Sequence, residues 1–163
     1  MNKYEDIIKQ FLQMMEVDQK MRQRAINGHS QWDDKIDIEN TKRLKKIVDT
    51  IGWPTISKVG KKVSKVAWLI AQHADHDLEF QKKALNLLQE AARNDEVEHK
   101  QVAYLTDRIF LKEGKKQIYG TQFKKNEQGK FVPLPLKEPE NVNERRARVG
   151  LGTIEEYAKG FDK

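Results

Sequence analysis

Apolar residues recur every three or four positions over most of the first 113 residues, and this spacing predicts amphipathic helices packed as a bundle. The clearest stripe is Val59, Val63, Val66 and Ile70, which continues to His73. The same spacing predicts helices over residues 3–27, 40–51, 55–73, 78–93 and 95–113. Thr55, Asp77 and Asp95 stand where N-cap residues are expected.

The pattern changes after residue 115. Alternating residues predict two short strands over 117–123 and 130–134, with Pro133 restricting the second strand to an edge. Asn143 is expected to cap a short arginine-rich helix, and Thr153 with Glu156 forms a capping box for a last one. The predicted fold is mainly α: a single-domain helical bundle of about five helices with a small C-terminal β-hairpin and short terminal helices. Its parts are residues 1–114 (bundle), 115–136 (hairpin) and 137–163 (helical tail), within one domain, 1–163.

Composition excludes several classes. The chain has no cysteine, which excludes disulfides, thiolate metal sites and a cysteine nucleophile. No Gly-x-Ser-x-Gly elbow and no glycine-rich phosphate loop is present. Charges run through the first twenty residues, and no apolar run approaches membrane length, so we predict a soluble, cytoplasmic protein without a membrane partner.

The charge balance is basic: 31 Lys and Arg against 25 Asp and Glu give a net charge of +6. A basic chain is a candidate for nucleic-acid binding. Here both signs are interspersed, as on the solvated surface of ordinary helical proteins, and the lysine row Lys58, Lys61, Lys62 and Lys65 fits a solvent face. Nucleic-acid binding is therefore kept as an alternative.

Two histidines and two carboxylates crowd together at residues 73–77, His-Ala-Asp-His-Asp, where the longest apolar stripe ends. An aspartate that accepts from one imidazole nitrogen fixes the tautomer and leaves the other nitrogen for a ligand. We therefore predict His73 and Asp75 as the chemical pair, with His73 a general acid/base or a hydrogen-bond donor to a bound anion. The alternative is a histidine satisfied within the core.

A metal site is the other option for this segment. His76-Asp77 resembles the His-Asp pair of HD-type phosphohydrolases, for which His29 and Asp107 would be the distant ligands. Whether these four residues meet is left open. Because Asp77 is better placed as a helix cap, we predict neither metal nor cofactor.

Several motifs occur in one order: Asp18 with Arg22, Gly52-Trp53-Pro54, Gln72-His73-Ala74-Asp75, Phe80-Gln81, Asp107-Arg108, Tyr119-Gly120-Thr121-Gln122 and Arg145-Arg146. In them the chain resembles a bacterial family carried as a domain of unknown function, from about residue 10 to 157. The resemblance implies a set of marked residues and no reaction. His76 lies outside the family pattern, and Leu78 replaces a frequent proline.

The marked residues are too polar to be buried singly, so we expect them to gather around one cavity. It would lie between the ends of the helices over 3–27, 55–73 and 95–113, with residues 119–122 as a wall. The predicted ligand-binding residues are Asp18, Arg22, Trp53, Gln72, Gln81, Tyr104, Asp107, Arg108, Tyr119, Thr121, Gln122 and Arg145.

The predicted function is binding of a small anionic ligand such as a nucleotide, with acid/base chemistry on it as a further option. One alternative is a non-enzymatic interaction protein, phage- or defence-associated or nucleic-acid-binding, that uses its basic surface. The other is a metal-dependent HD-like phosphohydrolase. Whether the chain is an enzyme, and its oligomeric state, are left open.

Overall fold

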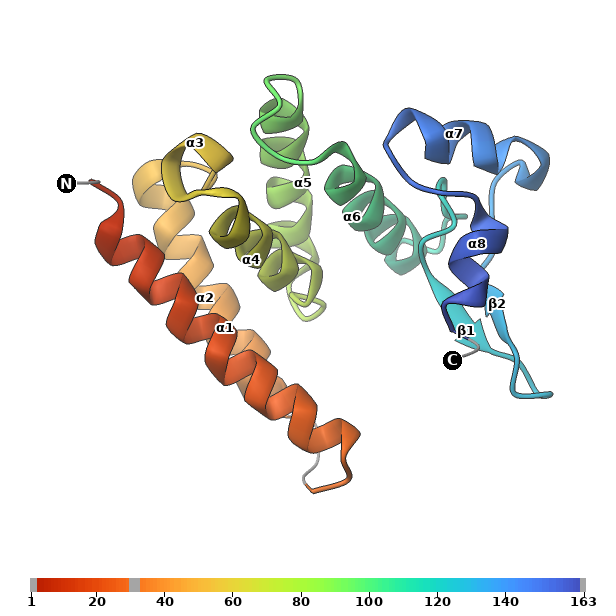
Figure 1. The fold of residues 1–163 in the computed structure, drawn as a ribbon, viewed down its shortest axis with the longest axis horizontal. Coiled ribbons are helices and arrows are strands. Elements are labelled where there is room, and N and C mark those ends of the chain that lie inside the picture. The colour runs from red at the N-terminus through yellow and green to blue at the C-terminus, as the bar shows by residue number, and fades with distance from the viewer. Residues whose placement is uncertain (1–2, 30–32, 162–163) are drawn as a thin grey trace. The chain divides into compact units, whose positions relative to one another are not determined.

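A computed structural model describes residues 3–29 and 33–161 (Figure 1). It is mainly helical with one small antiparallel hairpin, which confirms the predicted fold class. The chain forms two compact units, Met1–Val97 and Glu98–Lys163. The sixth helix thus belongs with the hairpin rather than with the preceding helices, and the assignment of the whole chain to one domain stays a prediction.

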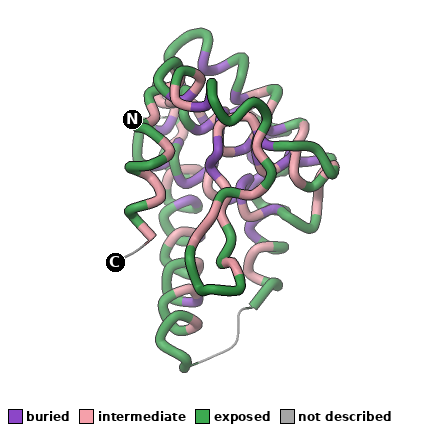
Figure 2. The backbone as a smooth tube through the Cα atoms, turned by 90° about the vertical axis from the view of Figure 1, so that its right-hand side faces the viewer, coloured by how far each residue is buried: buried purple, intermediate pink, exposed green. Residues whose placement is uncertain are grey.

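The first unit contains α1 (Glu5–Ile26), α2 (Asp34–Ile51), α3 (Ile56–Val59), α4 (Lys61–Gln72) and α5 (Leu78–Ala92). The α4 helix packs against α1, α2 and α5. These neighbouring helices contribute side chains that are almost completely buried: Phe11 and Met14 from α1, Leu44 from α2 and Leu88 from α5. In Figure 2 buried and exposed positions alternate along the helices, as amphipathic stripes predict.

Two boundaries in this unit differ from expectation. The α2 helix begins at Asp34 rather than near residue 40, because the Asp33 side chain accepts from the Lys35 N–H and caps it. The helix expected over 55–73 is broken at Gly60, whose φ of 82° few other residues adopt. The Thr55 side chain makes no capping bond, whereas the predicted cap Asp77 accepts from the Phe80 N–H at 2.9 Å.

The second unit contains α6 (His99–Lys112), β1 (Phe123–Lys125), β2 (Phe131–Pro133), a 3-10 turn η1 (Pro139–Asn141), α7 (Val142–Arg148) and α8 (Ile154–Lys159). The strands pair antiparallel, with Phe123 opposite Pro133 and Lys125 opposite Phe131. Phe161 stacks on both Phe123 and Phe131 and so packs against the hairpin.

Several predicted boundaries in this unit were wrong. Residues 117–122 form a loop instead of a strand. The α6 helix starts after a capping box of Glu98 and Gln101, because Asp95 has a φ of 54° and lies in the preceding turn. Asn141 rather than Asn143 is the N-cap residue of α7. The capping box of Thr153 and Glu156 is confirmed.

The described helices were also compared with the length and apolarity needed to cross a bilayer. None of those in residues 3–29 and 33–161 meets both requirements.

Candidate functional site

The end of α4 is held by Gln81, which lies on α5 and is fully buried. Its Nε2 donates to the carbonyl oxygens of Ala71 and Gln72, at 3.1 and 3.2 Å, and to Oδ1 of Asp75 at 3.3 Å. The last carbonyls of a helix lack partners within the helix. Gln81 therefore terminates α4 and fixes the turn that carries His73.

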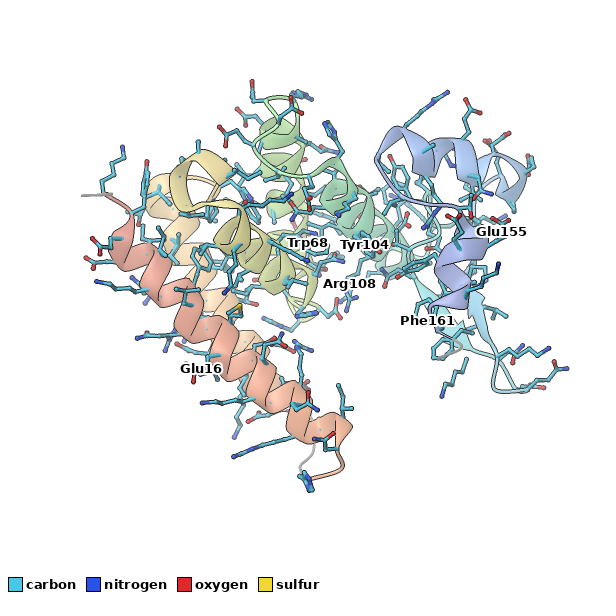
Figure 3. All side chains as sticks on the ribbon, viewed as in Figure 1. Glu16, Trp68, Tyr104, Arg108, Glu155 and Phe161 are labelled. Carbon is cyan, nitrogen blue, oxygen red and sulfur yellow. The ribbon has the colours of Figure 1, made fainter. Side chains whose placement is uncertain are left out.

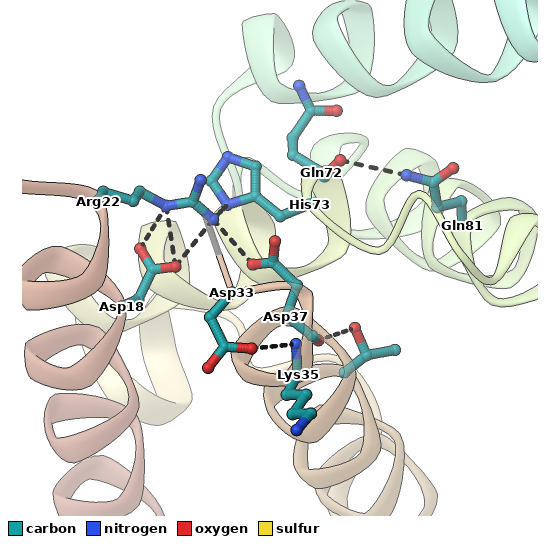
Figure 4. A network of polar contacts seen from close by, with 9 residues as sticks. Asp18, Arg22, Asp33, Lys35, Asp37, Gln72, His73 and Gln81 are labelled. Atoms are coloured by element: carbon teal, nitrogen blue, oxygen red, sulfur yellow. Dashed lines mark hydrogen bonds and ion pairs between the residues drawn. The ribbon is translucent and has the colours of Figure 1, made fainter. Parts of the chain in front are cut away.

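His73 is the C-cap residue of α4, and its ring contacts a charged cluster contributed by α1 and α2 (Figure 4). Arg22 Nε donates to both carboxylate oxygens of Asp18 at 2.9 Å. Arg22 Nη2 donates to Asp37 Oδ1 at 2.8 Å and lies 2.8 Å from His73 Nδ1. The side chains of Arg22, Asp18 and Asp37 are 12–15% exposed, so the cluster lies near the surface but is largely shielded. Three helices are thereby joined at one point.

The contact with Arg22 determines the tautomer of His73. A guanidinium has hydrogen-bond donors and no acceptor, so a hydrogen bond across this contact requires an Nδ1 that accepts and carries no hydrogen. The proton of the neutral ring then lies on Nε2. The sequence had paired His73 with Asp75, but Nδ1 contacts Arg22, while Asp75 Oδ1 accepts from Gln81.

Asp37 was missed by the sequence reasoning. A signal was present, because Asp37 stands four and seven residues before Thr41 and Leu44, both buried on the inner face of α2. Extending the predicted helix by one turn towards the N-terminus would have placed Asp37 on that face.

The described residues contain one group of candidate metal ligands, formed by Asp18, Asp37 and His73. One ligand atom of each lies within 4.8 Å of the others. Arg22 Nη2 lies 2.8 Å from an atom of all three. The guanidinium thus already supplies a positive charge at the point where these atoms converge. A cavity of about 20 Å³, lined by the same three residues among others, lies beside the cluster and has room for one water molecule.

Asp77, which the HD-like alternative would use as a metal ligand, has other partners in the structure. Asp77 caps α5 and accepts from Lys45 Nζ at 2.7 Å. The Lys45 hydrogen bond, and then the Phe80 N–H, hold the pKa of Asp77 below its usual value. The group of three candidate ligands found among the described residues includes neither His29 nor His76.

In the second unit, Asp107 on α6 organises the loop over residues 117–122. Its fully buried carboxylate accepts from the N–H groups of Ile118, Tyr119 and Thr121 and from the Thr121 hydroxyl, at 2.7–3.0 Å. Four donors from one loop converge on one carboxylate, which gives Asp107 and Thr121 a structural role. Burial, and then the Asp107 charge, raise the pKa of Tyr119.

The paired arginines of α7 bind carbonyl groups of the same loop. Arg145 Nε donates to the Ile118 carbonyl at 2.8 Å. Arg146 is 1% exposed, and its Nη1 donates to the carbonyls of Tyr119 and Gly120 at 2.8 and 3.1 Å. Burial lowers the pKa of Arg146. The side chains of both arginines therefore bind the backbone of the loop.

The remaining predicted residues also lie in one unit or the other. Trp53 is 3% exposed, and its Nε1 and the Oε1 of Gln72 are buried without a hydrogen-bond partner within the described part of the chain. On α6, Tyr104 packs edge-on against Tyr157, and Arg108 Nη1 donates to Gln122 Oε1 at 3.4 Å (Tyr104 and Arg108 are labelled in Figure 3).

The predicted site residues thus form two groups. In the first unit Asp18, Arg22 and His73 join one network, and Gln81 joins Gln72 and Asp75. In the second, Asp107, Tyr119, Thr121 and Arg145 surround one loop. A cavity common to all of them stays a prediction.

Comparison with known proteins gives one result. The model of the Family of unknown function (DUF6624) matches residues 5–163. None of the curated proteins and none of the solved structures matches the chain.

Proposed function

The chain belongs to the Family of unknown function (DUF6624), and from that premise we propose a function on the geometry of its own residues. The proposed function is binding of a small anionic ligand, one oxygen of which accepts a hydrogen bond from Nε2 of His73. The observation that carries this proposal is the 2.8 Å contact between Arg22 Nη2 and His73 Nδ1. A hydrogen bond from Arg22 to Nδ1 requires that the hydrogen of the neutral ring lie on Nε2, the nitrogen that would donate to the ligand.

The charge of the cluster restricts where an anion can bind. Two carboxylates against one guanidinium give −2 + 1 = −1 while His73 is neutral. An anion next to Asp18 or Asp37 would be repelled by that charge. The ligand is therefore expected on the Nε2 side of the ring, away from both carboxylates.

The same contact distinguishes two roles for His73. A general base at Nε2 needs that nitrogen unprotonated, with the hydrogen on Nδ1. Arg22 occupies Nδ1, so proton transfer at Nε2 would first require Arg22 to leave. In the present arrangement the residue acts as a neutral hydrogen-bond donor, and acid/base chemistry would need the cluster to rearrange.

Thermal unfolding with inorganic phosphate, AMP and succinate tests the binding. A ligand at one hundred times its dissociation constant stabilises the folded state by about 2.7 kcal/mol, which corresponds to several degrees for a chain of this size. The shift should disappear in His73→Ala and persist in His76→Ala, which removes the exposed neighbouring imidazole. Equal shifts in wild type and His73→Ala would contradict the proposal.

The nitrogen-15 chemical shifts of the His73 ring test the tautomer without a ligand. We expect a protonated Nε2 and an unprotonated Nδ1 near neutral pH, with a mixture of tautomers in Arg22→Gln. A protonated Nδ1 in the wild type would remove the basis of the donor role.

A further inference from the structure

A long groove is formed by α1 and α2, and its lining includes none of Asp18, Asp37 and His73. It consists of a cavity of about 490 Å³ and a second of about 400 Å³, both lined by Glu39 and Arg43. On α1 the lining extends from Ile7 to Lys20, which is about 20 Å at 1.5 Å per residue. We propose that this groove binds an acidic amphipathic helix of another protein, an interaction independent of the ligand proposed for His73.

The floor of the groove is mainly apolar in the larger cavity, whereas in the smaller one Ile7 and Ile47 lie among polar and charged side chains. Met14 and Ile47 form buried parts of it, Ile36 is half-buried, and Val17 is 51% exposed. On α1 the lining residues Ile7, Gln10, Met14 and Val17 follow helical spacing, and on α2 so do Ile36, Asn40, Arg43 and Ile47. Two helices that present such rows side by side form the seat for a third helix, whose own apolar residues at i, i+3 or i+4, and i+7 enter the groove.

The charges on the rim select the kind of helix. Glu16 pairs with Lys20 at 2.6 Å, and Glu39 pairs with Arg43 at 3.1 Å, each within its own helix (Glu16 is labelled in Figure 3). Lys35 lines the larger cavity and Lys46 the smaller, and neither makes an ion pair with another residue in 3–29 or 33–161. Two ammonium groups about three helical turns apart on α2 therefore remain for carboxylates of the occupant.

Other occupants fit less well. A second copy of the chain presents the same surplus of positive charge, so pairing groove against groove would bring like charges together. A nucleic acid would meet an apolar floor between Met14 and Val17 and the carboxylates of Glu16 and Glu39, where a phosphate backbone needs cations.

Fluorescence anisotropy of a labelled 14-residue helical peptide, titrated with the full chain, tests the proposal. The probe carries leucines at helical spacing and glutamates on the flanks of that stripe; a matched probe carries lysines instead. We expect saturable one-to-one binding of the acidic probe and at least tenfold weaker binding of the basic one. Val17→Glu and the pair Lys35→Glu with Lys46→Glu should each weaken binding at least tenfold.

Ile38→Glu is the matched control, because Ile38 is 46% exposed on α2 and does not line the groove. It should bind as the wild type does. If Val17→Glu fails to fold by circular dichroism, the lysine pair, which is fully at the surface, decides the test. Equal affinity for both probes, no anisotropy change, equal effects of Val17→Glu and Ile38→Glu, or a dimer that Val17→Glu dissociates would each overturn the proposal.

Discussion

Replacing Asp107 by alanine tests how the loop over residues 117–122 is built. The substitution removes the acceptor of three backbone N–H groups and one hydroxyl, all in a site with no exposed carboxylate surface. A buried donor left unsatisfied costs about 1–3 kcal/mol. Two effects reduce the sum: the loop can relax so that water reaches some of the donors, and the substitution also removes a buried charge. We therefore expect the free energy of unfolding to fall by about 3–5 kcal/mol.

Amide hydrogen exchange locates the effect. In Asp107→Ala the amides of Ile118, Tyr119 and Thr121 should lose protection by about two to three and a half orders of magnitude, since 1.4 kcal/mol corresponds to a factor of ten. Asp107→Asn should reduce the protection of only some of these amides. Its carbonyl oxygen can still accept from Ile118 and Tyr119, whereas its NH₂ group would face the two donors of Thr121.

Thr121→Val is the control for the size of the effect, because it removes one hydroxyl donor and should cost about 1 kcal/mol in urea unfolding. If Asp107→Ala costs no more than Thr121→Val, or if Ile118 and Tyr119 keep their protection, the carboxylate does not organise the loop. Asp107 would then be available for the ligand-binding role that the sequence suggested.

Three further predictions concern contacts elsewhere in the fold. Gly120→Ala should cost about 1–3 kcal/mol in urea unfolding, because φ is 64° and the new Cβ would lie 2.5 Å from Ile154 Cδ1. Gln81→Leu should cost about 1–3 kcal/mol and increase amide exchange at the end of α4, since the helix carbonyls lose their donor. The lowered pKa of Asp77 means that its contribution is complete above its unfolded pKa of about 4 and is lost as the pH falls through the folded value. The stability difference between wild type and Asp77→Asn, which breaks the ion pair with Lys45, should therefore be larger at pH 7 than at pH 3.

The helices were predictable because their signals are local. Apolar spacing predicted α1, α4, α5 and α6, and the caps at Asp77 and Thr153 were read from neighbouring residues. The loop over 117–122 was not, since its alternating residues imitate a strand. What bends it is the carboxylate of Asp107, more than ten residues away on α6, and no window of local sequence contains that contact.

In the candidate site, too, local contacts were predictable from the sequence and distant ones were not. The pair of Asp18 and Arg22, four residues apart on α1, was predictable as a helical ion pair. The contact between His73 and Arg22 was not, because the two residues are 51 positions apart in the sequence. The contacts of these polar residues depend on how three helices pack, which the local sequence does not contain.

The two groups of polar residues differ in what they bind, and therefore in how readily their contacts can be exchanged. Asp107 and Arg146 bind backbone groups, so neither can change partners unless the loop between them unfolds. Arg22, Asp37 and His73 bind one another through side chains near the surface, so rotation about side-chain bonds is enough to exchange partners. Exchanging a partner within the set of Arg22, Asp37 and His73 therefore breaks only single hydrogen bonds, each worth about 1–3 kcal/mol where a charged group is involved. We therefore propose that a ligand acts on the cluster around His73, whereas the backbone bonds of Asp107 give its network a structural role.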